Sequence, residues 1–99
     1  MRKPNIAISV GDLNGVGVEI ALKAHDEVST LCSPIYCVNA NMLSKAAKLL
    51  NVELPSNFTI HDVEGDFEIE AGVVSANSGL YSYDSFMSGV ELCEKKEAD

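Results

Sequence analysis

A glycine-rich stretch near the N-terminus holds the residues whose spacing could support ligand chemistry. Three glycines, an aspartate and an asparagine fall between residues 11 and 17. An apolar run over residues 6–10 precedes the stretch and an amphipathic run follows from residue 18, which predicts a strand, a turn and a helix. Free N–H groups at such a helix start favour anions, phosphates above all. The residues that could face an anionic ligand or a nucleotide cofactor are therefore Gly11, Asp12, Asn14, Gly15, Val16 and Gly17.

The spacing within this stretch does not fit two well-known nucleotide-binding loops. No Gly-Lys-Ser/Thr sequence closes it, as a P-loop requires. Gly15-Val16-Gly17 supplies only part of the dinucleotide-binding fingerprint, because Ile20 stands where the third glycine belongs. The acid expected after the second apolar run is also missing. Two interpretations stay open: a ligand-facing loop, or a structural turn that leads into a helix.

Two local features of the stretch can be predicted from residue type. Asp12 or Asn14 can cap the following helix by accepting a hydrogen bond from a backbone N–H group. At least one of the three glycines is expected to have a positive φ, because the chain reverses direction there within a few residues.

The elements that would position this stretch follow from hydrophobic periodicity. The run at residues 6–10 does not alternate, which predicts a strand that is buried on both faces. His25, beside the apolar face of the next helix, is expected to be a solvated side chain. Ser33-Pro34 is expected to end that helix. The helix has its apolar positions at Ile20, Ala24, Val28 and Leu31.

A second strand and a second helix repeat this pattern. The strand is predicted at residues 34–38, and the helix is capped by Asn39 or Asn41 and ends near Asn51. Strand–helix–strand–helix order with short connections predicts a right-handed βαβ unit with parallel strands. The predicted fold class is therefore α/β.

The second half of the chain has a different pattern. Phe58-Thr59-Ile60 is a short strand candidate, and residues 61–70 alternate apolar residues with five carboxylates. Such alternation is typical of an exposed strand or hairpin, and we favour it over a metal cluster or a His61-Asp62 metal pair. A loop is predicted at residues 76–79, followed by a helix that continues to Asp99. The apolar face of this last helix is predicted at Tyr83, Phe86, Val90 and Cys93.

Composition limits the classes of partner. The 99 residues carry a formal net charge of −8, which argues against binding to nucleic-acid backbones and to anionic membranes. No apolar run approaches the roughly 18 residues of a membrane span. The three cysteines, Cys32, Cys37 and Cys93, form no C-x-x-C motif and are expected to be reduced thiols in a cytoplasmic protein.

Two stretches of the chain resemble one enzyme family. KPNIAISVGDLNGVGVEIALKA is similar to the opening strand, GDPAGIGPEI loop and helix of the 4-hydroxythreonine-4-phosphate dehydrogenases, and it departs from them at Leu13-Asn14 and Val18. Residues 73–75 and 78–83 resemble a second segment of that family. The isocitrate and isopropylmalate dehydrogenases share a related loop, so the resemblance implies a three-layer α/β/α fold of the isocitrate/isopropylmalate dehydrogenase-like type. Residues 1–99 would be the N-terminal part of such a domain, with an apparent truncation after Asp99.

The resemblance also implies an activity for the longer protein. The family oxidises 4-phosphooxy-L-threonine with NAD or NADP, and a metal-assisted decarboxylation follows, in pyridoxal phosphate biosynthesis. The divalent metal ion (zinc, magnesium or cobalt) and the phosphate are bound downstream of the matched region. No catalytic or metal-binding residue is therefore expected within residues 1–99, and the isolated chain is expected to be inactive. A cytoplasmic homodimer without nucleic-acid or membrane partners is the expected assembly.

Three alternatives remain at this point. The chain could be a non-catalytic α/β module that binds a phosphate or nucleotide on the glycine-rich stretch. It could be a relative of the isopropylmalate and isocitrate dehydrogenases instead. It could also be a scaffold whose glycine-rich stretch touches no ligand.

Overall fold

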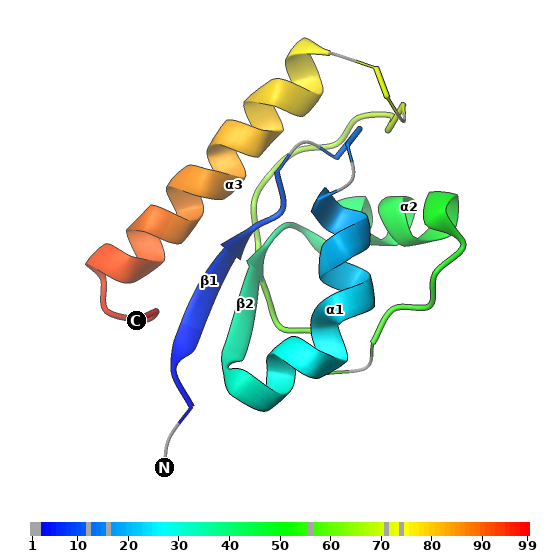
Figure 1. The fold of residues 1–99 in the computed structure, drawn as a ribbon. Coiled ribbons are helices and arrows are strands. Elements are labelled where there is room, and N and C mark those ends of the chain that lie inside the picture. The colour runs from blue at the N-terminus through cyan, green and yellow to red at the C-terminus, as the bar shows by residue number, and fades with distance from the viewer. Residues whose placement is uncertain (1–2, 12, 16, 56, 71, 74) are drawn as a thin grey trace.

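The computed structural model describes residues 3–11, 13–15, 17–55, 57–70, 72–73 and 75–99. Strands and helices alternate in the first half of the chain, and one long helix follows in the second half (Figure 1). The elements are β1 (Asn5–Ser9), α1 (Gly17–Leu31), β2 (Ser33–Cys37), α2 (Ala40–Leu50), β3 (Ile60–His61) and α3 (Ala76–Glu94).

The three strands form one parallel sheet in the order β1-β2-β3. Ile8 lies opposite Tyr36, and Tyr36 lies opposite Ile60. Helices α1 and α2 lie on one side of the sheet and α3 lies on the other (Figure 1). The predicted α/β class, the parallel pairing and the three layers are therefore present, although β3 begins two residues later than the strand predicted at Phe58.

Helix α2 forms as the sequence predicts because both of its ends are fixed locally. The Oδ1 atom of Asn39 accepts a hydrogen bond from the Met42 N–H group at 2.8 Å. Asn51 adopts the left-handed conformation, with φ 55°, and so closes the last turn. The helix buries Met42, Leu43, Ala46 and Ala47.

The predicted buried face of α1 is wrong. Ile20 and Leu31 are 61% and 77% exposed, whereas Val18, Leu22 and His25 are buried. Both sets recur at helical spacing, so periodicity alone could not choose between them. On the buried face, the His25 ring has hydrogen-bond partners in β2 and in the segment before β3.

The prediction of a solvated His25 is wrong as well, because the ring is only 1% exposed. Its Nδ1 atom lies 2.9 Å from the Tyr36 hydroxyl and its Nε2 atom lies 3.1 Å from Oδ1 of Asn57. The Phe58 ring packs against both His25 and Tyr36. This cluster fastens α1 to β2 and to the segment before β3.

Helix α3 begins earlier and buries a different face than predicted. Ser75 caps it by accepting from the Ser78 N–H group at 3.1 Å, so residues 76–79 are helical and not a loop. Tyr83, Phe86 and Cys93 are exposed, and the helix ends at Glu94 before Asp99 is reached. The buried side chains are Ser78, Tyr81, Ser85 and Leu92.

Hydrogen bonds explain why serines face inward on α3. The Ser85 hydroxyl donates to the Cys37 carbonyl at 2.6 Å and accepts from the Val10 N–H group at 3.1 Å. It therefore satisfies two buried backbone groups at the ends of β1 and β2. A pattern that ranks residues by hydrophobicity cannot find such a contact.

The acidic segment at residues 62–70 is extended but forms no strand or hairpin within the part of the chain that the structure describes. Its five carboxylates are exposed and Val63 is buried, as the alternation suggests. The Val63 carbonyl accepts from the Asn39 side chain at 2.7 Å and from the Tyr81 hydroxyl at 2.9 Å. Hydrogen bonds from side chains, and not from a neighbouring strand, thus fix the position of this segment.

Strand β1 is less buried than predicted because it lies at the edge of the sheet. Ile6 is 38% exposed, and Ser9 is exposed as well. The three cysteines are free thiols, as predicted, and burial raises the pKa of the Cys37 thiol. No helix in the described ranges is long and apolar enough to cross a bilayer.

Candidate functional site

The glycine-rich stretch leaves the carboxyl end of β1 and leads into α1. Gly11 has φ +70°, which confirms the predicted positive φ, and a Cβ atom there would meet nothing within 4 Å. Glycine is therefore needed at this position for its backbone conformation and not for space. Asp12 and Val16, two of the six candidate residues, lie outside the described residues.

Gly17 is required for a different reason. A Cβ atom at this position would lie 3.0 Å from the Val10 carbonyl oxygen, so a side chain would push α1 away from the end of β1. The backbone at Gly15 and Gly17 is nevertheless exposed. These two residues form the part of the stretch that a ligand could reach.

Asn14 does not cap α1, which corrects one of the two capping predictions, because its side chain faces another segment. The Oδ1 atom accepts from the Glu70 N–H group at 2.8 Å, and Nδ2 donates to the Val73 carbonyl at 2.9 Å. The residue is only 4% exposed. Its carboxamide therefore binds the chain itself and is not available to a cofactor.

The backbone of Asn14 extends the same contact. Its carbonyl accepts from the Gly72 N–H group at 2.7 Å, and its N–H group donates to the Ser78 hydroxyl at 3.4 Å. We call the hydrogen bonds from Asn14 to residues 70–78 the Asn14 clamp. The clamp joins the two stretches that carry the family resemblance, although they lie about 60 residues apart in sequence.

A small apolar pocket lies beside Gly15, between α1, α2 and the acidic segment. Its volume is about 160 Å³, which suits a small apolar group better than a whole nucleotide. The lining residues are Leu13, Gly15, Val18, Ala46, Leu49, Leu50 and Ile69.

The charges near the start of α1 are modest. Glu19, in the first turn, forms an ion pair with Lys23 at 3.3 Å; the Lys23 side chain is exposed and that of Glu19 is half-buried. A carboxylate in the first turn already complements the positive end of the helix dipole. An anionic ligand here would gain from the free N–H groups but would also meet the Glu19 charge.

The described residues do not fit a metal site. They contain no group of three or more His, Cys, Asp or Glu side chains that could hold an ion. His25 is engaged with Tyr36 and Asn57, and the acidic segment is held by Lys45, whose ammonium lies 2.6 Å from Asp66. This ion pair holds the pKa of the Asp66 carboxyl below its usual value.

Sequence reasoning missed the residues that shape this region, namely Asn14 as a clamp, Ser85 as a bridge and Tyr81 as a donor. Each acts over a long sequence separation, so no local pattern shows it. One signal was available, because Asn14 stands where the chain departs from the family pattern, and its partners Val73 and Ser78 lie in the second resembling segment.

Curated relatives match the whole chain. A 4-hydroxythreonine-4-phosphate dehydrogenase from Sulfurimonas denitrificans is 60% identical over 99 residues, which are 100% of this chain and 32% of that protein. One from Campylobacter fetus subsp. fetus is 47% identical over 98 residues, which are 99% of this chain and 32% of that protein. One from Helicobacter pylori (strain Shi470) is 41% identical over an alignment of 105 residues, which covers 100% of this chain and 34% of that protein. No protein-family model matches the chain.

The fold has a similar counterpart among solved structures. The crystal structure of a 4-hydroxythreonine-4-phosphate dehydrogenase from Burkholderia phymatum superposes with a TM-score of 0.78 at 26% identity, covering 100% of this chain and 35% of that one. The chain therefore spans about a third of the length of the relatives that it matches.

Proposed function

We propose that residues 1–99, which are homologous along their whole length to the 4-hydroxythreonine-4-phosphate dehydrogenases, form the N-terminal third of an oxidoreductase of that family. The observation that carries this proposal is the 60% identity across the entire chain. The complete fold would then be of the isocitrate/isopropylmalate dehydrogenase-like type. The complete protein would work as a cytoplasmic homodimer in pyridoxal phosphate biosynthesis.

The proposed reaction is oxidation of 4-phosphooxy-L-threonine, followed by decarboxylation. NAD or NADP supplies the hydride acceptor when it is bound. The decarboxylation would use a divalent ion such as zinc, magnesium or cobalt. Because the described residues do not fit a metal site, we assign no step through the ion to this chain.

The proposed role of this chain is to build one wall of the cofactor cleft. The glycine-rich stretch lies at the carboxyl end of a parallel strand, where open α/β sheets bind ligands. Gly15 and Gly17 leave backbone exposed there, and α1 begins at Gly17 with its free N–H groups. The Asn14 clamp would hold this wall in a fixed shape, which reduces the entropy lost when a ligand binds.

Activity of the longer protein tests this proposal. A fusion of residues 1–99 to the downstream part of the Sulfurimonas denitrificans relative should reduce NAD or NADP in the presence of 4-phosphooxy-L-threonine. The 99-residue chain alone should show no turnover, because positioning of the hydride needs residues that it lacks. Turnover by the 99-residue chain, or a folded fusion without activity, would contradict the proposal.

Asp12 offers a sharper test of the glycine-rich stretch. In the fusion, Asp12→Ala and Asp12→Asn should change the cofactor Michaelis constant alike if the charge acts at the cleft. If Asp12 caps α1 instead, Asn should behave as wild type and Ala should lose about 1 kcal/mol of stability. Asp26→Ala, which removes an exposed charge from α1, is the matched control. If neither substitution changes affinity or stability, the stretch has no such role.

A scaffold function has its own support. Asn14 and Gly17 are explained by contacts within the chain, which is what a structural turn into α1 would show. Titration of NAD and of inorganic phosphate against the 99-residue chain separates this possibility from a binding module. Saturable binding that is lost in Gly15→Asp would support the module, and absence of binding would support the scaffold.

A further inference from the structure

Asn14 is a polar residue that is buried where the glycine-rich stretch turns outward. It is only 4% exposed, whereas Gly15 and Gly17, which follow it, are exposed. Burial of a carboxamide is unfavourable unless its polar atoms find hydrogen-bond partners. Both polar atoms of the Asn14 side chain have partners in residues 70–75. The side chain is therefore buried for the contacts that it makes within the chain.

These partners require an amide and not merely a polar side chain. Oδ1 accepts from the Glu70 N–H group at 2.8 Å, and Nδ2 donates to the Val73 carbonyl at 2.9 Å. Nδ2 also lies 3.5 Å from the hydroxyl of Ser75, the N-cap residue of α3. An ionised carboxylate has no hydrogen to donate, and an alanine side chain has neither donor nor acceptor. Asparagine supplies both groups at this length.

Contacts on both sides of Gly15 fix the glycine-rich stretch. On one side is the Asn14 clamp. On the other side, Gly17 lies so close to β1 that a Cβ atom there would be 3.0 Å from the Val10 carbonyl oxygen. Only two residues separate Asn14 from Gly17. The Gly15 backbone therefore has little freedom to move while both contacts are present.

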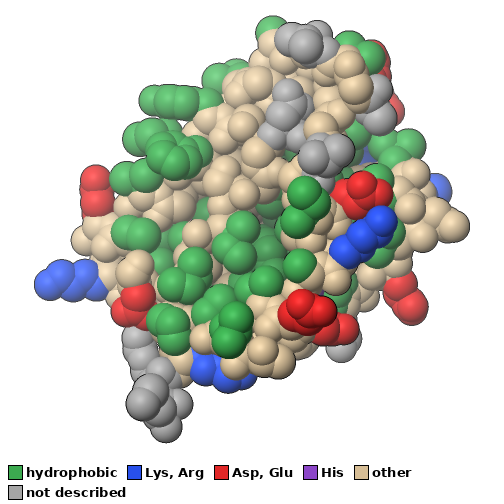
Figure 2. Space-filling view, in the orientation of Figure 1, with side chains coloured by type: hydrophobic (Ala, Val, Ile, Leu, Met, Phe, Trp, Pro, Cys, Tyr) green, Lys and Arg blue, Asp and Glu red, His purple; other side chains and the backbone are tan. Residues whose placement is uncertain are grey.

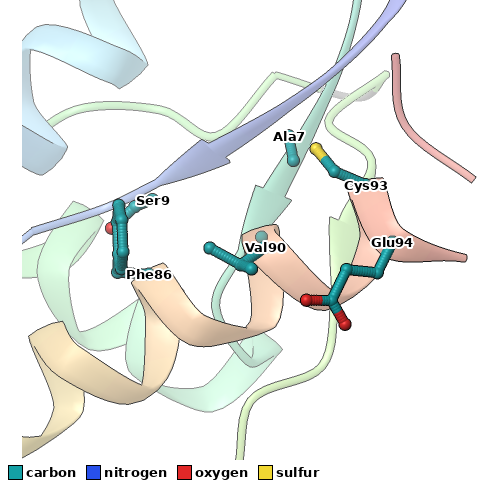
Figure 3. A pocket seen from close by; sticks show the side chains of 7 residues that line it. Ala7, Ser9, Phe86, Val90, Cys93 and Glu94 are labelled. Carbon is teal, nitrogen blue, oxygen red and sulfur yellow. The ribbon is translucent and has the colours of Figure 1, made fainter. Parts of the chain in front are cut away.

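The apolar surface between β1 and α3 lies further along the helix than the clamp. A groove of about 600 Å³ runs between the two elements, and Figure 3 shows Ala7 of β1 with Phe86 and Val90 of α3 along it. Hydrophobic side chains gather on this side of the molecule (Figure 2). Phe86 and Val90 lie well beyond the first turn of α3. It is therefore the Asn14 clamp that joins the glycine-rich stretch to the start of the helix.

The position of the Gly15 backbone matters because groups that bind a ligand must be held accurately. A displacement of about 1 Å at such a group can cost roughly a hundredfold in rate. A stretch rich in glycine is a poor support by itself, since glycine has more backbone freedom than any other residue. A buried neighbour with several hydrogen bonds supplies the missing rigidity.

We propose that Asn14 is a positioning residue for the cofactor: its carboxamide, bonded to residues 70–75, fixes the exposed Gly15 backbone at the wall of the cleft. The proposal rests on the proposed function in that the ligand is the NAD or NADP of that reaction. The GDPAGIGPEI motif of the related enzymes has alanine where this chain has Asn14. Alanine cannot form these bonds, so the resemblance does not imply the role.

Backbone NMR relaxation tests the positioning role without reference to activity. In the 99-residue chain, Asn14→Ala should lower the order parameter of the Gly15 N–H group from about 0.85 to below about 0.6, the usual values for rigid and flexible backbone. The Leu22 N–H group should keep its order and reports that α1 is intact. Asn57→Ala is the matched control, because it removes a partner of the buried His25 ring at the opposite, amino end of the sheet. It should leave Gly15 unchanged.

Asn14→Asp separates the two halves of the clamp. Its carboxylate can still accept from the Glu70 N–H group but cannot donate to the Val73 carbonyl, so Gly15 should lose order in this variant too. The variant keeps the size of the side chain and replaces Asn14→Ala in the test if that variant does not fold. Wild-type order at Gly15 in folded Asn14→Asp would contradict the requirement for an amide.

Steady-state kinetics of the fusion to the Sulfurimonas denitrificans segment relate this position to cofactor binding. Asn14→Ala should raise the Michaelis constant for NAD or NADP roughly ten- to a hundredfold. The kcat value should change far less, because the variant displaces a group that binds the cofactor and not a reacting atom. A residue with a purely structural role would lower the melting temperature without this difference between the two constants. That is the result expected for Asn57→Ala.

Two results would overturn the proposal. One is an unchanged Gly15 order parameter in folded Asn14→Ala. The other is an equal effect of Asn14→Ala and Asn57→Ala on the cofactor Michaelis constant. A folded wild-type fusion without activity contradicts the proposed function, whereas the relaxation of Gly15 decides the positioning role by itself. The two proposals can therefore fail separately.

Discussion

The two sides of the sheet are covered in different ways. Toward α1 and α2, the contact is made by apolar side chains such as Leu22, Met42 and Ala46. Toward α3, Ser85 adds hydrogen bonds to the ends of β1 and β2, beside the buried apolar side chain of Leu92. The comparison shows that a helix can be fixed to a sheet mainly by packing, or by packing together with buried polar bridges. Hydrophobic periodicity reports only the first.

The largest loss is expected on the packed side. Met42→Ala removes a fully buried side chain from α2 and should destabilise the chain by about 2–5 kcal/mol. Urea denaturation followed by circular dichroism measures the change. Leu49→Ala, on the same helix at a 62% exposed position, is the control and should change stability by about 0.5 kcal/mol or less. Equal losses would mean that α2 is not held by burial.

On the α3 side of the sheet, the critical residue is Ser85. Ser85→Ala leaves the Val10 N–H group and the Cys37 carbonyl without their buried partner and should cost about 1–3 kcal/mol. The same denaturation experiment applies, with Ser44→Ala at an exposed position of α2 as control. A loss no larger than that of the control would show that α3 is held by other contacts.

The N-cap residues of α2 and α3 allow a further comparison of the two sides of the sheet. Ser75→Ala should cost about 1 kcal/mol, the usual value of a helix cap. Asn39→Ala should cost more, because Asn39 also donates to the carbonyls of Val63 and Gly65. Thermal melts of both variants measure the difference. The reverse order would show that the cap, and not the link to the acidic segment, is the main contribution of Asn39.

The smallest expected effect is a loss of stability at alkaline pH, which involves a tyrosine on each side of the sheet. Burial raises the pKa of Tyr36, which packs toward α1, and that of Tyr81, which lies on α3. The unfolded state then loses these protons first, so stability should fall as pH rises above the ordinary tyrosine pKa of 10.0. Denaturation at a series of alkaline pH values should show a weaker fall for Tyr81→Phe than for wild type. An unchanged slope would contradict the role of Tyr81 burial.

The sequence allowed prediction of those elements that local residues decide. Helix α2 is an example, since Asn39 and Asn51 fix its ends and its apolar face is unambiguous. The parallel strands, and a positive φ at one of the three glycines, also followed from local pattern. The inner face of α1 could not be predicted in this way, because two stripes compete and the His25 partners lie in distant segments.

The candidate site was predictable in position but not in its internal contacts. Glycine spacing located the turn between β1 and α1, and the structure places that turn at the carboxyl end of β1. The partners of Asn14 lie between residues 70 and 78, beyond the reach of any local rule. The pattern also could not show that serines would face inward on α3, because their value depends on backbone groups that only the folded sheet presents.

The Asn14 clamp has a thermodynamic consequence. Because Asn14, in the glycine-rich stretch, bonds to Val73 and Ser78, restriction of the stretch should also restrict the first turn of α3. A ligand that restricts the stretch would then narrow the ensemble of conformations at the start of α3. By linkage, a second ligand that binds and orders the start of α3 would strengthen binding at the stretch by the factor with which the first ligand strengthens its own binding. Asn14 thereby couples the two segments energetically, without any moving part between them.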